Sequence, residues 1–125
     1  MLKVNAYKRW LENKFKGSIL YEGDDLPVGV ILERSSVLDD STLLGSTCEI
    51  ILSHNYSTPV FSLTKPLIEI YSDTNKIQFE TLIDTTEITG IPDSYNLKID
   101  YEILVTFPDT ALLTVERGII KYEQK

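Results

Sequence analysis

The sequence predicts a mostly β protein, built as an antiparallel sandwich or a small barrel of about seven or eight short strands. Two observations predict this class. Apolar and polar residues alternate over several short stretches, which is the pattern of strands with one buried and one wet face. Turn residues separate those stretches at intervals of roughly eight to twelve residues. The 125 residues are enough for one domain whose hydrophobic core is stable without disulfide bonds or metal ions.

The first segment is an exception, because residues 3–16 predict a helix. Its apolar side chains share one face at spacings of three and four: Val4, Tyr7, Trp10, Leu11 and Phe15. Asn5 is a candidate N-cap, and Gly17 is a natural stop. We therefore expect a basic amphipathic N-terminal helix in residues 1–17 and a β-sandwich domain in residues 18–125.

After Gly17 the period changes from helical to alternating. The expected strands are, in chain order, residues 18–22, 26–34, 47–53, 59–63, 67–71, 76–83, 95–105 and 111–122. We expect Pro66 to separate two short strands, and Gly118 to mark a bulge or bend in the last one. Residues 35–46 read as a polar loop, and Asp73-Thr74-Asn75 as a hairpin turn.

The clearest alternation lies in residues 95–105. Its apolar positions are Tyr95, Leu97, Ile99, Tyr101, Ile103 and Val105, and its polar positions are Asn96, Lys98, Asp100 and Glu102. An unbroken period of two predicts a strand with one buried face. A similar pattern over 47–53 places Cys48 on the buried face, where it is expected to act as a small hydrophobe.

Charge is distributed unevenly along the chain. Residues 1–16 contain five basic residues and one acidic residue, a net charge of +4, whereas residues 17–125 contain seven and eighteen, a net charge of −11. The acidic body repels nucleic-acid phosphate over most of its surface. The basic segment suits phosphate, an anionic surface or an acidic protein face, and the last includes the body of a neighbouring copy. The predicted helix packs on its own domain or docks on another subunit, with a nucleic-acid or membrane role as the remaining alternative.

Few residues suggest catalysis or metal binding. The single histidine, His54, lies in a predicted turn, and the single cysteine excludes an intrachain disulfide. Asp24-Asp25 and Asp39-Asp40 are acidic pairs of the kind that hold Ca²⁺ in loops, but a solvated turn is the simpler interpretation. No set of nucleophile, base and orienting group emerges. We therefore expect no enzyme activity, no cofactor and no metal.

Neither a secretory signal nor a membrane span is predicted. Residues 1–17 carry charges where a signal peptide has its apolar centre. No apolar run approaches the roughly 20 residues that cross a bilayer. Synthesis in the cytoplasm is the default expectation, with no membrane partner.

Several pieces of the sequence follow one another in a familiar order. These are Glu22-Gly23-Asp24 before the apolar stretch Leu26–Leu32, Leu43-Leu44-Gly45-Ser46-Thr47 before Cys48–Leu52, Pro92-Asp93-Ser94-Tyr95 before the long strand, and the closing stretch 112–122. In this order residues 18–122 resemble the immunoglobulin-like N-terminal domain of phage baseplate upper proteins and related tail or neck modules. The basic start, about sixteen residues long, departs from that pattern.

The resemblance implies an immunoglobulin-like β-sandwich and a non-enzymatic structural role in a phage tail, baseplate or neck. It implies other phage structural proteins as partners, a homo-oligomer in the virion, and a virion location after synthesis in the host cytoplasm. The expected interface residues are Tyr7, Arg9, Trp10, Leu11, Lys14 and Phe15, because aromatic residues and Arg are favoured anchors. The alternative is a carbohydrate or host-surface binding module that uses His54, Tyr56, Tyr71 and Tyr95, although Tyr71 and Tyr95 are expected to face the core.

Overall fold

The computed structural model describes residues 4–8, 19–21, 23–34, 43–54, 61–73, 75–88, 97–108 and 110–123. Within these residues the regular elements are strands and one short 3₁₀ turn, η1 (Thr85–Glu87). The strands are β1 (Val4–Lys8), β2 (Ile19–Tyr21), β3 (Asp25–Arg34), β4 (Thr47–His54), β5 (Phe61–Ser72), β6 (Lys76–Asp84), β7 (Leu97–Thr106) and β8 (Leu112–Glu123). The mostly β prediction is therefore confirmed.

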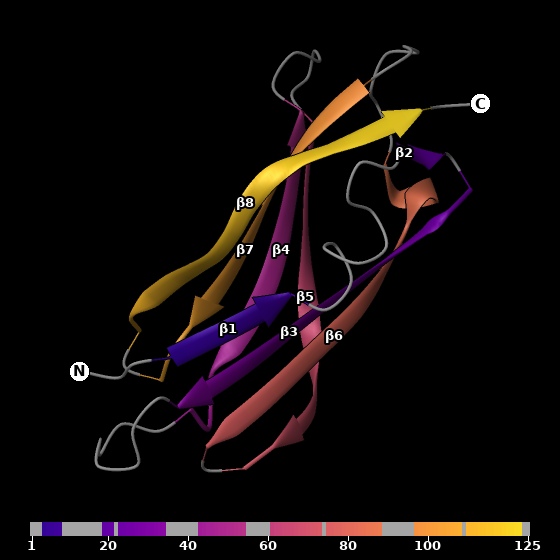
Figure 1. The fold of residues 1–125 in the computed structure, drawn as a ribbon. Helices are drawn as coiled ribbons and strands as arrows, with labels where there is room; N and C mark the ends of the chain where they lie inside the picture. The colour runs from indigo at the N-terminus through magenta and orange to yellow at the C-terminus, as the bar shows by residue number, and fades with distance from the viewer. Residues whose placement is uncertain are drawn as a thin grey trace.

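The strands form two layers that share one strand. Their hydrogen-bonded order is β1-β3-β6-β5-β4-β7-β8-β2. Strand β5 belongs to both layers, because Phe61–Leu67 pairs with β4 and Ile68–Ser72 pairs with β6. Figure 1 shows β1, β3 and β6 side by side in one layer and β4, β7 and β8 in the other. All neighbours are antiparallel except β2, which runs parallel to β8.

One hydrophobic core fills the space between the layers. From one layer β3 and β6 contribute Leu26, Val28, Val30, Leu32, Ile77, Phe79 and Ile83. From the other, β4, β7 and β8 contribute Cys48, Ile50, Leu52, Ile99, Ile103, Val105, Ile120 and Tyr122. Every second residue of these strands faces inward, as the alternation predicted. The sandwich is confirmed over the small barrel, and burial of Cys48, only 4% exposed, is confirmed with it.

The N-terminal helix prediction is wrong where the structure describes that segment. Residues Val4–Lys8 form β1, which pairs antiparallel with β3 from Val4↔Arg34 to Lys8↔Val30. An isolated helix as short as the one predicted for residues 3–16 is only marginally stable. The outer side of β3 offers Val4–Lys8 a row of backbone hydrogen bonds instead, and this tertiary pairing overrides the local period. Residues 9–16 of the expected helix lie outside the described residues.

Two details of the predicted strands also need correction. Pro66 does not separate two strands, since it lies inside the 12-residue β5, opposite Glu49. A proline is compatible with this position because β5 has a strand neighbour on only one side there. Gly118 is not the bulge, since it pairs in regular register with Tyr101. The register shift lies earlier in β8, where Val115 is the extra residue between Thr114 and Glu116.

Candidate functional site

The predicted interface residues fall mainly outside what the structure describes. Tyr7 lies in β1, in register with Ile31 of β3. Arg9, Trp10, Leu11, Lys14 and Phe15 lie outside the described residues. Their role at an interface therefore stays a prediction, although the helix that was to carry Tyr7 is replaced by a strand.

A different surface stands out on β5 and β6. Half of the large hydrophobic side chains that are exposed in the described ranges lie on these two strands: Ile68 at 67%, Ile70 at 52%, Tyr71 at 50% and Leu82 at 53%. We call these four residues the β5 edge patch. A group of large apolar side chains on a folded surface is typical of a contact site for another macromolecule. This patch was not predicted from the sequence.

A bulge in β5 builds the patch. Ile68 is in register with Glu80 and Tyr71 with Gln78, so Ile70 is an extra residue on the β5 side. Because Glu80 and Gln78 share one face of β6, the bulge turns Ile68 and Tyr71 to that same outer face. The expectation that Tyr71 faces the core is therefore wrong. The available signal was the run 67-LIEIY-71, whose apolar residues at 67, 68, 70 and 71 break the alternation.

The patch lies on an open edge of its layer. Strand β4 leaves β5 at Leu67, so in the described part of the chain Ile68–Ser72 has a strand neighbour only on the β6 side. The backbone groups on the other side form a row that another strand can pair with. Apolar side chains and an open backbone edge therefore occur together at one place on the molecule.

Polar contacts fix the end of the patch. The Tyr71 hydroxyl donates to Oδ2 of Asp73 at 2.7 Å, and Oδ1 of Asp73 accepts from the backbone N–H of Asn75 at 2.7 Å. The bond to Asp73 raises the pKa of Tyr71, and the same bond lowers the pKa of Asp73. The Lys76 ammonium lies 5.9 Å from the centre of the Tyr71 ring. The ring is thus held in place although half of it is exposed.

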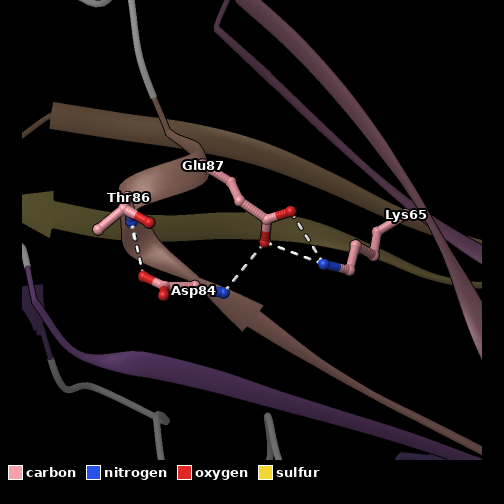
Figure 2. Close-up of polar contacts among 4 residues, drawn as sticks. All are labelled: Lys65, Asp84, Thr86 and Glu87. Atoms are coloured by element: carbon pink, nitrogen blue, oxygen red, sulfur yellow. Dashed lines mark hydrogen bonds and ion pairs between the residues drawn. The ribbon is translucent and has the colours of Figure 1, made fainter.

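An ion pair between β5 and η1 supports the strand where it changes layers. Lys65 Nζ donates to both carboxylate oxygens of Glu87, at 2.9 and 3.0 Å (Figure 2). Glu87 also accepts from the backbone N–H of Asp84 at 3.1 Å, while Asp84 accepts from the backbone N–H of Thr86 at 2.9 Å. These reciprocal bonds are a capping box. Together with the ion pair, they connect the end of β6 to Lys65 of β5, which lies three residues before Ile68.

Replacing Asp84 with alanine is expected to lower the thermal midpoint at neutral pH, because the N–H of Thr86 loses its acceptor. The hydrogen bond from the backbone of Thr86 holds the pKa of Asp84 below its ordinary value of 3.8. The carboxylate therefore stabilises the fold above that value, and this contribution is lost as the pH falls through the folded-state pKa. Thermal melts of wild type and Asp84→Ala should differ at neutral pH and approach each other in acid.

The matched control for this prediction is Asp84→Asn, which keeps a neutral oxygen acceptor at the cap. Its midpoint should lie between those of the other two proteins at neutral pH. The difference in midpoint between Asp84→Asn and Asp84→Ala should change little as the pH falls. A gap between wild type and Asp84→Ala that is equally wide at every pH would show that the charge of Asp84 contributes nothing.

The outer face of the other layer has a shallow hollow of about 340 Å³. Its lining residues are Ile51, Ser53, Asp100, Tyr101, Glu102, Arg117 and Gly118. Arg117 Nε lies 3.3 Å from a carboxylate oxygen of Glu102, and the Arg117 side chain is largely exposed. Two of these residues, Ser53 and Tyr101, carry a hydroxyl and two carry a carboxylate, but none is a histidine that would activate a hydroxyl. The hollow therefore does not combine a nucleophile with a base that would activate it.

The two residues with the most reactive side chains lie in different settings. Burial raises the pKa of the Cys48 thiol to about 12, so the thiolate is not available at neutral pH. The ring Nδ1 of His54 lies 3.0 Å from the backbone oxygen of Lys98, at the end of β4. His54 and Tyr71 do not form one sugar site, because His54 is in register with Phe61, and Tyr71 lies roughly 33 Å further along β5. Tyr56 and Tyr95 lie outside the described residues.

Asp24 of the acidic pair Asp24-Asp25 has a structural role. Its carboxylate accepts from the backbone N–H of Tyr21 at 3.0 Å, and its backbone oxygen accepts from Thr85 at 3.3 Å. In the residues that the structure describes, no three side chains of the metal-binding types gather. Likewise, no helix there is long and apolar enough to cross a membrane. The second pair, Asp39-Asp40, lies outside the described residues.

The strand order defines the class of this protein. One layer has the order β1-β3-β6-β5, and the other has β4-β7-β8 flanked by β5 and β2. The first order matches strands A, B, E and D of an immunoglobulin-like sandwich, and the second matches C, F and G. The chain is thus an immunoglobulin-like all-β domain whose most marked surface feature is an apolar open edge.

Comparisons with known proteins add no family to this class. No protein-family model matches the sequence, and no curated protein matches it. Among solved structures, murine CRIg is 10% identical with a TM-score of 0.36, and the match covers 98% of each chain. A cohesin module from a family 33 glycoside hydrolase of Clostridium perfringens is 10% identical with a TM-score of 0.35, over 100% of each chain. At scores this low neither likeness indicates a function, and the relation to phage proteins stays a prediction.

Proposed function

We propose that this chain is a non-enzymatic structural protein of a phage virion, a component of the tail, baseplate or neck that acts through protein–protein contacts. The observation that carries the proposal is the β5 edge patch. All four side chains are at least half exposed; Ile68, Ile70 and Tyr71 lie on the β5 segment whose backbone edge is open in the described part of the chain, and Leu82 lies on the adjacent β6. Removing such side chains from water on association is favourable by roughly 25 cal/mol per Å².

The support on either side of the patch makes it suited to a repeated contact. The ion pair of Lys65 with Glu87 and the bond of Tyr71 to Asp73 hold β5 at both ends of the exposed stretch. A surface that is ordered before binding loses less conformational freedom on binding. The phage setting rests on the resemblance of residues 18–122 to baseplate and tail modules, and a small rigid sandwich suits a particle made of many identical parts.

The test is to look for the chain in purified particles of the phage that encodes it. Mass spectrometry should detect it at a copy number comparable to other tail proteins, and particles from a deletion strain should have defective tails. Complementation with wild type or with Ile119→Asp, on the other layer, should restore intact particles, whereas Ile70→Asp should not. Absence of the chain from purified particles that remain infectious after its deletion would overturn the proposal.

A further inference from the structure

We propose that the β5 edge patch receives residues 9–16 of a second copy of this chain, so that the copies join head to tail. The inference rests on the proposed function and names the partner of the same surface. Three observations carry it: the chemistry of the patch, the composition of residues 9–16, and the positions of β1 and β2 relative to β5. Residues 9–16 themselves lie outside the described residues, so their contribution is argued from charge and side-chain type.

The patch is apolar at its centre and acidic around it. Glu80 is in register with Ile68, and Asp73 accepts the bond from Tyr71. Glu69 lies beside Ile68 on β5 but on the other face of the strand, in register with Phe79. Lys76, near the Tyr71 ring, is the basic residue beside these three acids. An apolar surface with an acidic surround favours a partner with aromatic and basic side chains. It disfavours a partner that is itself acidic.

Residues 9–16, RWLENKFK, have that composition. They contain three basic residues and one acidic residue, together with Trp10, Leu11 and Phe15. The described strands outside β1 belong to the part of the chain with a net charge of −11. Within this sequence, residues 9–16 are therefore the segment that complements the patch in charge and in apolar character. Trp and Arg are also the side chains most enriched among residues that dominate binding energy.

The segment and the patch belong to different parts of the strand order. Residues 9–18 connect β1 to β2, which are the two ends of the strand order, whereas β5 lies where the order passes from one layer to the other. A contact within one copy would require the chain to pass from β1 across β3 and β6 to β5, and then back across β4, β7 and β8 to β2.

The geometry therefore points to a contact between different surfaces of two copies. The edge that carries β1 and β2 meets the edge that carries β5 of the next copy. Such a contact leaves a free patch at one end and a free basic segment at the other, so it continues to a closed ring or an open filament. A two-fold pairing of β5 with β5 would instead bring Glu69, Asp73 and Glu80 of both copies together, which like charge disfavours.

The experiment measures mass in solution by light scattering for the full chain and three variants. Ile70→Asp alters the patch, the double variant Arg9→Glu/Lys14→Glu alters the segment, and Ile119→Asp is the control on the other layer. Wild type and Ile119→Asp should self-associate with equal strength, more weakly at high salt. Each of the other two should associate roughly tenfold to a hundredfold more weakly. Equal unfolding midpoints for all four proteins would show that each remains folded.

Mixing the two weakened variants separates head-to-tail contact from the alternatives. Each keeps one intact half of the contact, so the mixture should form a one-to-one dimer and no larger species. A wild type that stays monomeric at every concentration and salt would overturn the inference, as would a mixture that stays monomeric beside an associating wild type. A monomeric wild type would leave the proposed function standing, because that proposal fails only if the chain is absent from particles.

Discussion

Replacing Ile103 with alanine is expected to lower the free energy of unfolding by roughly 2–5 kcal/mol. Ile103 is fully buried in β7, where Ile50 of β4 is its register partner. Truncation removes apolar contacts between the layers and leaves a cavity that neighbouring side chains fill only in part. Denaturant unfolding followed by circular dichroism measures the loss as a lower midpoint at an unchanged slope.

The neighbouring residue supplies the control for this prediction. Leu104 is half-buried and faces the outside of the same strand, so Leu104→Ala should cost about 1 kcal/mol or less. Equal losses for Ile103→Ala and Leu104→Ala would show that β7 is not in the register described, because a shift by one residue exchanges its two faces.

Replacing Gly118 with alanine is expected to destabilise the protein by roughly 1–3 kcal/mol. A Cβ at Gly118 would lie 2.7 Å from two atoms of the Tyr101 side chain, its Cε1 and its hydroxyl oxygen. The ring is partly buried against the core, and it lies across the strand directly over the glycine. The added methyl group must therefore displace the ring from its packing. Denaturant unfolding again gives the size of the effect.

A double-mutant cycle with Tyr101→Ala shows whether the ring is the cause. Without the ring, Gly118→Ala should be neutral or stabilising, since alanine loses less conformational freedom than glycine when a strand forms. The change of sign between the two backgrounds is the expected result. A loss of the same size in both backgrounds would mean that Gly118 is required for its backbone and not for the room it leaves.

The sequence predicted the parts of the fold that depend on local alternation. The inward-facing row of Ile99, Ile103 and Val105 could be predicted because burial with a period of two shows in the order of neighbouring residues. The burial of Cys48 followed from the same pattern. These features need only the knowledge that one face of each strand is covered, and not which strand covers it.

The features that could not be predicted depend on pairing between distant strands. Whether Val4–Lys8 becomes a helix or a strand is decided by the free side of β3, which the local sequence does not describe. Pro66 is tolerated inside β5 because only one neighbour lies beside it, and that follows from the exchange of β4 for β6. The β5 edge patch exists for the same reason. Its bulge at Ile70 is defined by the pairing of β5 with β6, in which Glu69 and Tyr71 are in register with the adjacent residues Phe79 and Gln78.

The parallel pair of β2 and β8 has a consequence for how the chain folds. It joins Ile19 to Lys121, about a hundred residues apart in sequence, and closing so long a loop is slow. The hairpins β5–β6 and β7–β8 need only short loops, so they are expected to form within microseconds. Folding is then limited by the later docking of these hairpins and by the return of β2. In that interval β5 is expected to be paired already with β6 and, across the short connection 55–60, with β4.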